Sequence, residues 1–184
     1  MLSDETAYRH YLAGDEAAAT LLVEKYGDPL TLYIHGYIRD LHEAEDLMIE
    51  AFSRMFAKER PIREDGTFKA YLYKTARRLA LRHSQKHRLH FLRLEELPFE
   101  PQSDVLADTQ LHVNERNRQL YTALQQLKAE YREALYLVYF ENMSYREAAA
   151  VMAKSEAQVT NLVHRGKQSL KHILEKEGFV YADN

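Results

Sequence analysis

The sequence predicts an all-α protein made of two small helical domains joined by a flexible linker. Apolar residues make up 46% of the 184-residue chain, and they recur mostly at helical spacing. Glycine and proline are scarce, at six and four, and no run of alternating β-branched residues indicates a sheet. The segment 94–108 carries Pro98 and Pro101 and few periodic apolar positions. It therefore separates a first domain, 1–93, from a second, 109–184.

The first domain is expected to contain four helices, because its apolar residues recur with a period near 3.6. Gly27, Asp28 and Pro29 form the expected turn between the first two of them, since proline interrupts a helical pattern. The expected helices span 15–26, 29–39, 42–58 and 67–91. In the second domain the same criteria give helices at 109–127, 130–141, 144–153 and 155–176.

The last two expected helices each begin with a capping-box pattern, in which a serine and a side chain three residues later satisfy free backbone N–H groups. Ser144 is matched with Glu147, and Ser155 with Gln158. Only residues 153–154 remain for the turn between the helices. Two helices joined so tightly, the second long and polar on its outer face, are typical of a helix-turn-helix that enters a DNA major groove. An ordinary helical hairpin is the alternative interpretation.

The net charge of −3 conceals a strong division along the chain. Residues 1–59 hold five Lys/Arg against twelve Asp/Glu, whereas residues 60–93 hold ten against two. Residues 94–143 hold four against nine, and residues 144–177 hold six against four. Because phosphate binding depends on local clusters of cations, the two basic blocks are candidate nucleic-acid contacts. Solvated helix faces are the alternative explanation of such charge runs.

The expected helix 67–91 combines an apolar stripe with a separate face of one aromatic ring and three cations. At 100° per residue, Tyr71 falls together with Lys74, Arg78 and Arg82, away from the stripe that begins at Phe68. Cations that hold phosphates beside a ring that stacks on a base are the combination used to grip a single strand. The alternative is that Tyr71 is a half-buried core residue.

The expected helix 42–58 carries an acidic row beside its apolar stripe. Glu43, Asp46 and Glu50 lie on this row. An acidic row is most often a solvated face, so the row alone indicates no partner. His42 and Glu43 do not begin the zinc motif H-E-x-x-H, because Asp46 occupies the position of its second histidine.

Composition and motifs argue against several classes of function. The chain has no cysteine, which excludes disulfides and thiolate metal sites. Its acidic beginning has no apolar core, so no signal peptide is expected, and no apolar run is long enough for membrane insertion. A cytoplasmic location is therefore expected. No nucleophile motif, P-loop or paired acid–base spacing is present, which predicts a protein that is not an enzyme.

A histidine trio offers one metal hypothesis. His83, His87 and His90 are spaced four and three residues apart and could share a helix face. They also continue the apolar stripe of helix 67–91, and no carboxylate or cysteine lies nearby in the sequence to complete a site. We therefore predict no metal ligands and no cofactor, and leave a metal-dependent helical enzyme as the rival class.

Three blocks of the chain resemble the sigma-70 family of bacterial RNA polymerase sigma factors. The blocks 42–56 (HEAEDLMIEAFSRMF) and 68–80 (FKAYLYKTARRLA) are similar to region 2 of that family. The block 123–149, with ALQQL, YREALYL and MSYREAA, is similar to region 4. The order of the blocks, and the short connection between the halves, resemble the extracytoplasmic-function (ECF) group.

The resemblance implies both a domain assignment and a function. Region 2 would occupy 1–93, and the helix-turn-helix of region 4 would occupy 109–184. The protein would direct core RNA polymerase to specific promoters and initiate transcription. The implied partners are the polymerase core, through its β′ clamp helices and β flap, promoter DNA, and an anti-sigma factor.

The resemblance also assigns three sets of site residues. The residues implied for the −10 promoter element are Tyr71, Lys74, Arg77, Arg78 and Arg82. The residues implied for docking on core polymerase are Asp46, Leu47, Glu50 and Arg54. The residues implied for the −35 element are Ser155, Gln158, Thr160, Asn161, His164 and Arg165.

The expected recognition helix departs from the family pattern. Thr160 stands where lysine is usual, Leu162 where arginine is usual, and Glu156 adds a negative charge near the groove. The amides of Gln158 and Asn161 could pair with adenine, and the helix N-terminus could receive a phosphate. We expect weak binding to a −35 element. The alternative function is a sigma-like helical interaction protein that binds polymerase or a regulator without productive promoter opening.

Overall fold

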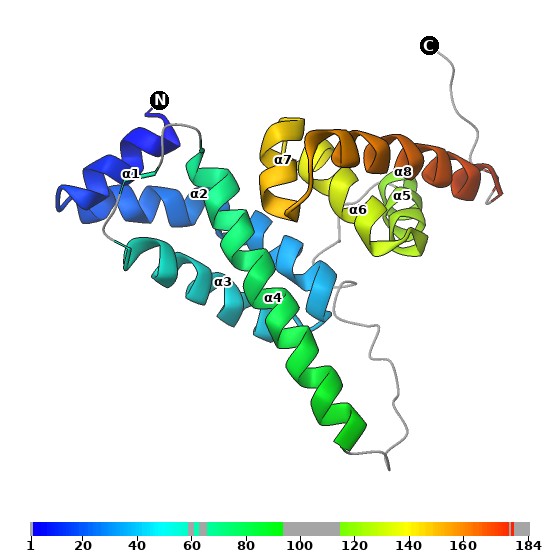
Figure 1. Ribbon diagram of the computed structural model, residues 1–184, viewed down its shortest axis with the longest axis horizontal. Coiled ribbons are helices and arrows are strands. Elements are labelled where there is room, and N and C mark those ends of the chain that lie inside the picture. Colours follow the sequence, from blue (N-terminus) through cyan, green and yellow to red (C-terminus); the bar gives the residue numbers. More distant parts are fainter. Residues whose placement is uncertain (1, 59–60, 63–65, 94–114, 177, 179–184) are drawn as a thin grey trace. The chain divides into compact units, whose positions relative to one another are not determined.

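The structure is a computed structural model, and it describes residues 2–58, 61–62, 66–93, 115–176 and 178. Within these ranges every regular element is a helix, which confirms the all-α prediction (Figure 1). The chain divides into two compact units, Met1–Pro101 and Gln102–Asn184. The expected linker, 94–108, lies outside the described residues. Each unit is described by itself below.

The first unit contains α1 (Asp4–Leu12), α2 (Glu16–Ile38), α3 (Leu41–Phe56) and α4 (Phe68–Arg93). The sequence prediction missed α1. Its start is nevertheless well specified, because the hydroxyl of Ser3 accepts from the backbone N–H of Thr6, and two acids occupy the first turn. The tyrosines of α1 then pack against the ends of α3 and α4.

Helix α2 is continuous through Pro29, so the predicted turn at residues 27–29 is wrong. Proline in a helix interior costs about 3 kcal/mol in a peptide. Here the helix buries Leu22 and Tyr26 before the proline and Leu30 and Ile34 after it. Because this apolar face packs against α1, α3 and α4, its burial outweighs the local cost.

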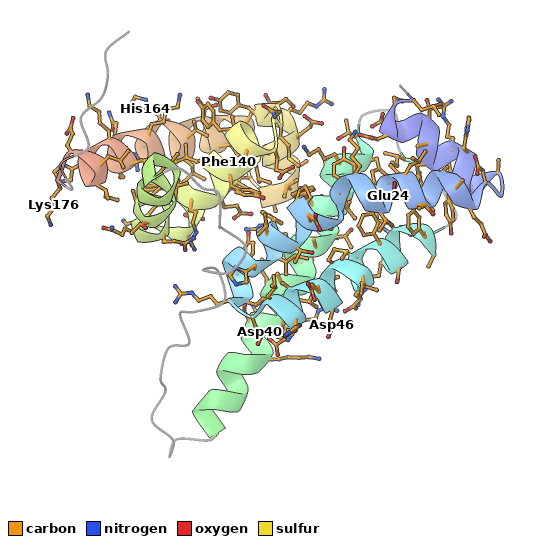
Figure 2. All side chains as sticks on the ribbon, turned by 180° about the vertical axis from the view of Figure 1, so that it is seen from behind. Glu24, Asp40, Asp46, Phe140, His164 and Lys176 are labelled. Carbon is orange, nitrogen blue, oxygen red and sulfur yellow. The ribbon has the colours of Figure 1, made fainter. Side chains whose placement is uncertain are left out.

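The core of the first unit lies where α2 meets the three other helices. Phe68, the first residue of α4, is fully buried and contacts the rings of Tyr8 and Tyr26, with centroids 5.4 and 6.0 Å away. The predicted apolar stripe of α4 is buried throughout, at Phe68, Leu72, Ala76 and Leu79. In both views the last turns of α4 extend beyond the ends of α2 and α3 (Figures 1 and 2).

The second unit contains α5 (Glu115–Gln126), α6 (Ala129–Leu135), the π-helical turn η2 (Tyr136–Phe140), α7 (Tyr145–Met152) and α8 (Glu156–Lys176). Helix α8 packs against α5, α6 and α7. The expected helix 130–141 corresponds to α6 followed directly by η2. In η2 the helix widens, and the N–H of Glu141 donates to the carbonyl of Tyr136. The part of the expected helix 109–127 before Glu115 lies outside the described residues.

Helices α7 and α8 form the predicted helix-turn-helix. The turn has Ala153 in the left-handed backbone region, with φ of 54°. The close approach of α8 to α6 occurs at Gly166, which is buried. A Cβ atom there would stand 3.2 Å from Cδ1 of Leu135 and 3.3 Å from Cβ of Tyr131. The glycine therefore allows α8 to pack tightly on the helix beneath it.

Candidate nucleic-acid interface

The outward face of α8 carries all of the residues predicted to contact a −35 element. Ser155, Gln158, Thr160, Asn161, His164 and Arg165 are all exposed. The opposite side of the helix buries Val159, Val163 and Leu174 against the rest of the unit. Figure 2 shows His164 on the side of α8 turned away from α5. The packing of α8 therefore presents these polar side chains together.

Several of these polar groups already make bonds at the start of α8, which Ser155 precedes. The backbone N–H of Ser155 donates to Oε1 of Gln158 at 2.8 Å, and the N–H of Gln158 donates to the Ser155 hydroxyl at 3.1 Å. This is the second predicted capping box. The hydroxyl of Thr160 donates to the carbonyl of Glu156 at 2.8 Å. The start of the helix is thus stabilised by the side chains that the sequence assigned to DNA.

One cation beside this face was not predicted. The ammonium of Lys167, also on α8, lies 4.6 Å from the ring centroid of Tyr139 in η2. A hydrogen bond with the Tyr139 hydroxyl raises the pKa of Lys167 above its ordinary value. Sequence periodicity could not reveal this pair, because it depends on the π-helical turn.

In the first unit, α4 presents the predicted aromatic and basic face. Tyr71 is 39% exposed, Arg78 and Arg82 are exposed, and Lys74 and Arg77 are half-buried. The ring of Tyr71 is therefore accessible on the surface, and the alternative that places it in the core is not favoured. The apolar stripe of α4 lies on a different side of the helix.

A further cation joins this face from the end of α3. The ammonium of Lys58 lies 4.2 Å from the ring centroid of Tyr71. Lys58 was outside the predicted set because it follows α3 in the sequence, whereas the other cations lie on α4. Only the fold brings the end of one helix to the first turn of the other.

The acidic row of α3 is partly exposed, with Asp46 exposed and Glu43 and Glu50 half-buried, and Leu47 beside it is not on the surface. Asp46 is exposed, and Figure 2 places it on the side of α3 turned away from α2. Glu50 accepts from both Nε and Nη2 of Arg54, at 3.0 and 2.6 Å. Leu47 is only 8% exposed and belongs to the core, whereas Ile49 is 57% exposed. The surface of α3 thus presents Ile49 as its apolar side chain, with Leu47 packed beneath.

Among the histidines of the first unit, His83 and His35 differ in their surroundings. Nε2 of His83 on α4 lies 3.6 Å from Oε2 of Glu43 on α3. The side chains of His87 and His90 lie outside the described residues, and among described side chains no group of three metal-binding types gathers. Burial lowers the pKa of His35 in the last turn of α2, which favours its neutral form.

Comparison with known proteins identifies both units. A family model described as sigma-70 region 2 matches residues 22–89, and one described as sigma-70 region 4 matches residues 117–170. The chain belongs to the sigma-70 family. Region 2 therefore contains most of α2 with α3 and α4, and region 4 contains the helix-turn-helix.

Individual sigma factors show the same similarity. The ECF RNA polymerase sigma factor SigE of Mycolicibacterium smegmatis is 30% identical over 170 residues, which cover 89% of this chain and 65% of that protein. The chain thus spans just under two thirds of the length of that relative. The ECF sigma factor SigM of Bacillus subtilis is 25% identical over 84% of this chain and 94% of its own.

A solved structure shares the fold. It is the sigma factor RpoE in complex with the anti-sigma factor NepR from Bartonella quintana, with 19% identity and a TM-score of 0.67 over 85% of this chain and 96% of that chain. In the part of the chain that the structure describes, no helix has the length and apolar content needed to cross a bilayer.

Proposed function

We propose that this protein is an ECF-type sigma factor that directs core RNA polymerase to specific promoters and initiates transcription. The observation that carries the proposal is the exposed face of α4, where Tyr71 stands among cations in a unit that matches sigma-70 region 2. Such a face can stack a base on the ring and hold the neighbouring phosphates. Region 4 supplies a second DNA-reading face on α8.

The proposed contacts follow from these placements. The α4 face of Tyr71, Lys74, Arg77, Arg78 and Arg82 would hold the −10 element, and the exposed polar residues of α8 would contact the −35 element. The α3 surface with Asp46, Glu50 and Arg54, supported from beneath by Leu47, would dock on the β′ clamp helices. Region 4 would reach the β flap. The domain limits 1–93 and 109–184, with a linker at 94–108, remain part of the proposal.

Regulation and location follow from the same role. An anti-sigma factor is the expected regulator, since a solved sigma factor of this fold is bound to one. The protein would act in the cytoplasm, where polymerase acts on DNA, and would perform no catalysis of its own.

The decisive experiment is transcription by holoenzyme reconstituted from core polymerase and this protein. Promoters would first be selected from a random DNA library by binding to the holoenzyme, and then transcribed. We expect defined transcripts that depend on the protein. Tight polymerase binding without transcripts from any selected promoter would instead favour the sigma-like interaction protein, which the weakly basic α8 motivates.

A further inference from the structure

Helix α1 contacts both ends of the connection between α3 and α4. At the end of α3, the Tyr8 hydroxyl donates to the carbonyl of Met55 at 2.9 Å, and the Tyr11 hydroxyl donates to the carbonyl of Phe56 at 3.4 Å. At the start of α4, the backbone N–H of Phe68 donates to Oε1 of Glu5 at 3.2 Å. The three side chains are spaced three residues apart on α1, so they follow one side of the helix.

Each of these bonds suits the helix end that it meets. The last carbonyls of a helix and its first N–H groups lack partners within the helix. A carboxylate is favourable at an N-terminus, where the helix dipole is positive, and phenol hydroxyls can donate to carbonyls at a C-terminus. Ring contacts reinforce the bonds, since Tyr8 lies 5.4 Å from Phe68 and Tyr11 lies 4.6 Å from Phe56, between centroids.

The two helix ends that α1 holds carry two exposed members of the proposed DNA-binding face, Lys58 and Tyr71. Lys58 lies two residues beyond Phe56, and Tyr71 lies three residues beyond Phe68. Their cation–ring distance of 4.2 Å depends on how the end of α3 is set against the first turn of α4. A small shift of either end would therefore move the cation relative to the ring.

We propose that α1 is a positioning element for promoter opening, in which Glu5, Tyr8 and Tyr11 fix the end of α3 against the start of α4. The side chains of α1 touch no DNA in this proposal. They set where Tyr71 and Lys58 stand when an opened strand arrives. The inference rests on the proposed sigma-factor function and adds to it a role for a helix that the region 2 match, residues 22–89, does not include.

Two neighbouring acids on α1 provide a matched test. Glu5 bonds the start of α4, whereas Asp4 accepts from Nζ of Lys25 and from the hydroxyl of Tyr26, both on α2 and both at 2.6 Å. Asp4→Ala therefore loosens α1 without removing a bond to either end of the connection. Glu5→Ala removes one such bond, and Glu5→Gln restores an oxygen that can accept it.

The variants would be compared as full-length proteins in three measurements. These are core polymerase affinity, promoter opening by holoenzyme from permanganate reactivity of unpaired thymines, and hydrogen exchange at the amides of residues 68–71. We expect Glu5→Ala to lower the extent of promoter opening by about tenfold, in keeping with the loss of one charge-assisted hydrogen bond. Its affinity for core polymerase should be unchanged. Glu5→Gln should recover most of the promoter opening. Asp4→Ala should stay within about twofold of wild type and leave exchange at residues 68–71 unchanged.

The outcomes separate this inference from the proposed function. Equal loss of opening in Glu5→Ala and Asp4→Ala would show that α1 contributes only general stability, and would overturn the inference. Normal opening in Glu5→Ala would overturn it as well. If wild-type holoenzyme opens no selected promoter, the proposed function fails. In that case faster exchange at residues 68–71 in Glu5→Ala alone would still show that α1 fixes the start of α4, and equal exchange in both variants would refute this.

Discussion

Two tyrosines of α4 stand two residues apart and have opposite surroundings. Tyr71 is 39% exposed beneath the ammonium of Lys58, whereas Tyr73 is fully buried and contacts the ring of Tyr33 at 5.1 Å. Helical geometry separates them by about 200°, which places one on the surface and the other in the core. Whether a tyrosine of α4 is exposed therefore depends on its position relative to the buried stripe and not on its chemical type.

The exposed ring of Tyr71 gives the first prediction. Tyr71→Ala should leave core polymerase binding intact and impair promoter opening, because base stacking on a ring is worth about 1–3 kcal/mol. Tyr71→Phe keeps the ring and should open promoters nearly as well as wild type. Permanganate reactivity of unpaired thymines measures the opening. Undiminished opening by a folded Tyr71→Ala protein would show that α4 grips phosphates only.

A second prediction separates stability from docking on α3. Leu47→Ala should lower the free energy of unfolding by about 2–5 kcal/mol, because it leaves a cavity in the core. Asp46→Ala, at an exposed position, should change that free energy by less than about 0.5 kcal/mol. It should instead weaken binding to core polymerase. Urea unfolding and competition for core polymerase measure the two effects, and wild-type core affinity in Asp46→Ala would argue against docking through this face.

The neighbourhood of His35 gives a third prediction, on pH. Burial lowers the pKa of His35 below its ordinary value of 6.5, although Asp40 nearby opposes the shift. As the pH falls through 6.5, the unfolded chain binds a proton that the folded chain does not, so the stability of the first unit decreases. His35→Gln should make stability between pH 7 and 5 less dependent on pH. Urea unfolding at several pH values measures this, and an unchanged dependence would show that His35 is not responsible.

At the scale of elements, the sequence predicted most helices and misjudged two. The capping boxes and apolar stripes of α3, α4, α7 and α8 are local signals, and the structure contains them. The predicted break at Pro29 was wrong because burial of apolar side chains on both sides of the proline outweighed its local preference against helix. Helix α1 was missed because it is short and its partners lie about 50 and 60 residues away in the chain.

The turn of the helix-turn-helix gives a prediction at this scale. Ala153 has φ of 54°, a conformation that costs a residue with a Cβ about 1–2 kcal/mol and costs glycine little. Ala153→Gly should raise the free energy of unfolding of the second unit by about 0.5–1 kcal/mol. Ala150→Gly, at an exposed position within α7, is the matched control and should lower it by about 1 kcal/mol. If both variants destabilise the protein equally in urea, the turn is not strained.

At the scale of the whole molecule, the division of charge along the chain indicated nucleic-acid contact, and the three family-like blocks indicated the function. Among described side chains, the first basic block places Arg78 and Arg82 on the surface of α4, and the second places Arg165 and Lys167 on the surface of α8. The sequence could place the ring and the cations of one helix on one side, as it did for Tyr71, Arg78 and Arg82. It could not bring in Lys58, Lys167 or Ile49, because exposure and contacts between elements are properties of the packed fold.

The acidic remainder of the chain gives the last prediction. The free protein should bind duplex promoter DNA weakly at physiological salt, because its two proposed DNA-reading faces are small and its first 59 residues are strongly acidic. Docking both faces on polymerase makes the second contact intramolecular, which should raise affinity by about 10²–10⁴. Arg78→Ala should weaken DNA binding and reduce the slope of log affinity against log salt concentration by about the contribution of one phosphate contact. Fluorescence anisotropy with labelled promoter measures both, and tight specific binding by the free protein would contradict the expectation.

The capping box at Ser155 also limits what α8 can read in a groove. Oε1 of Gln158 accepts from the backbone N–H of Ser155, so one of its two lone pairs is occupied and the oxygen is held at the start of the helix. A bidentate pair with adenine needs the oxygen and the nitrogen of the amide to face the same base. Gln158 would therefore have to turn its oxygen away from the cap to select adenine. While the cap bond is kept, its N–H groups can meet acceptors on adenine, guanine and thymine alike, so the bond that starts the helix would make this base contact permissive.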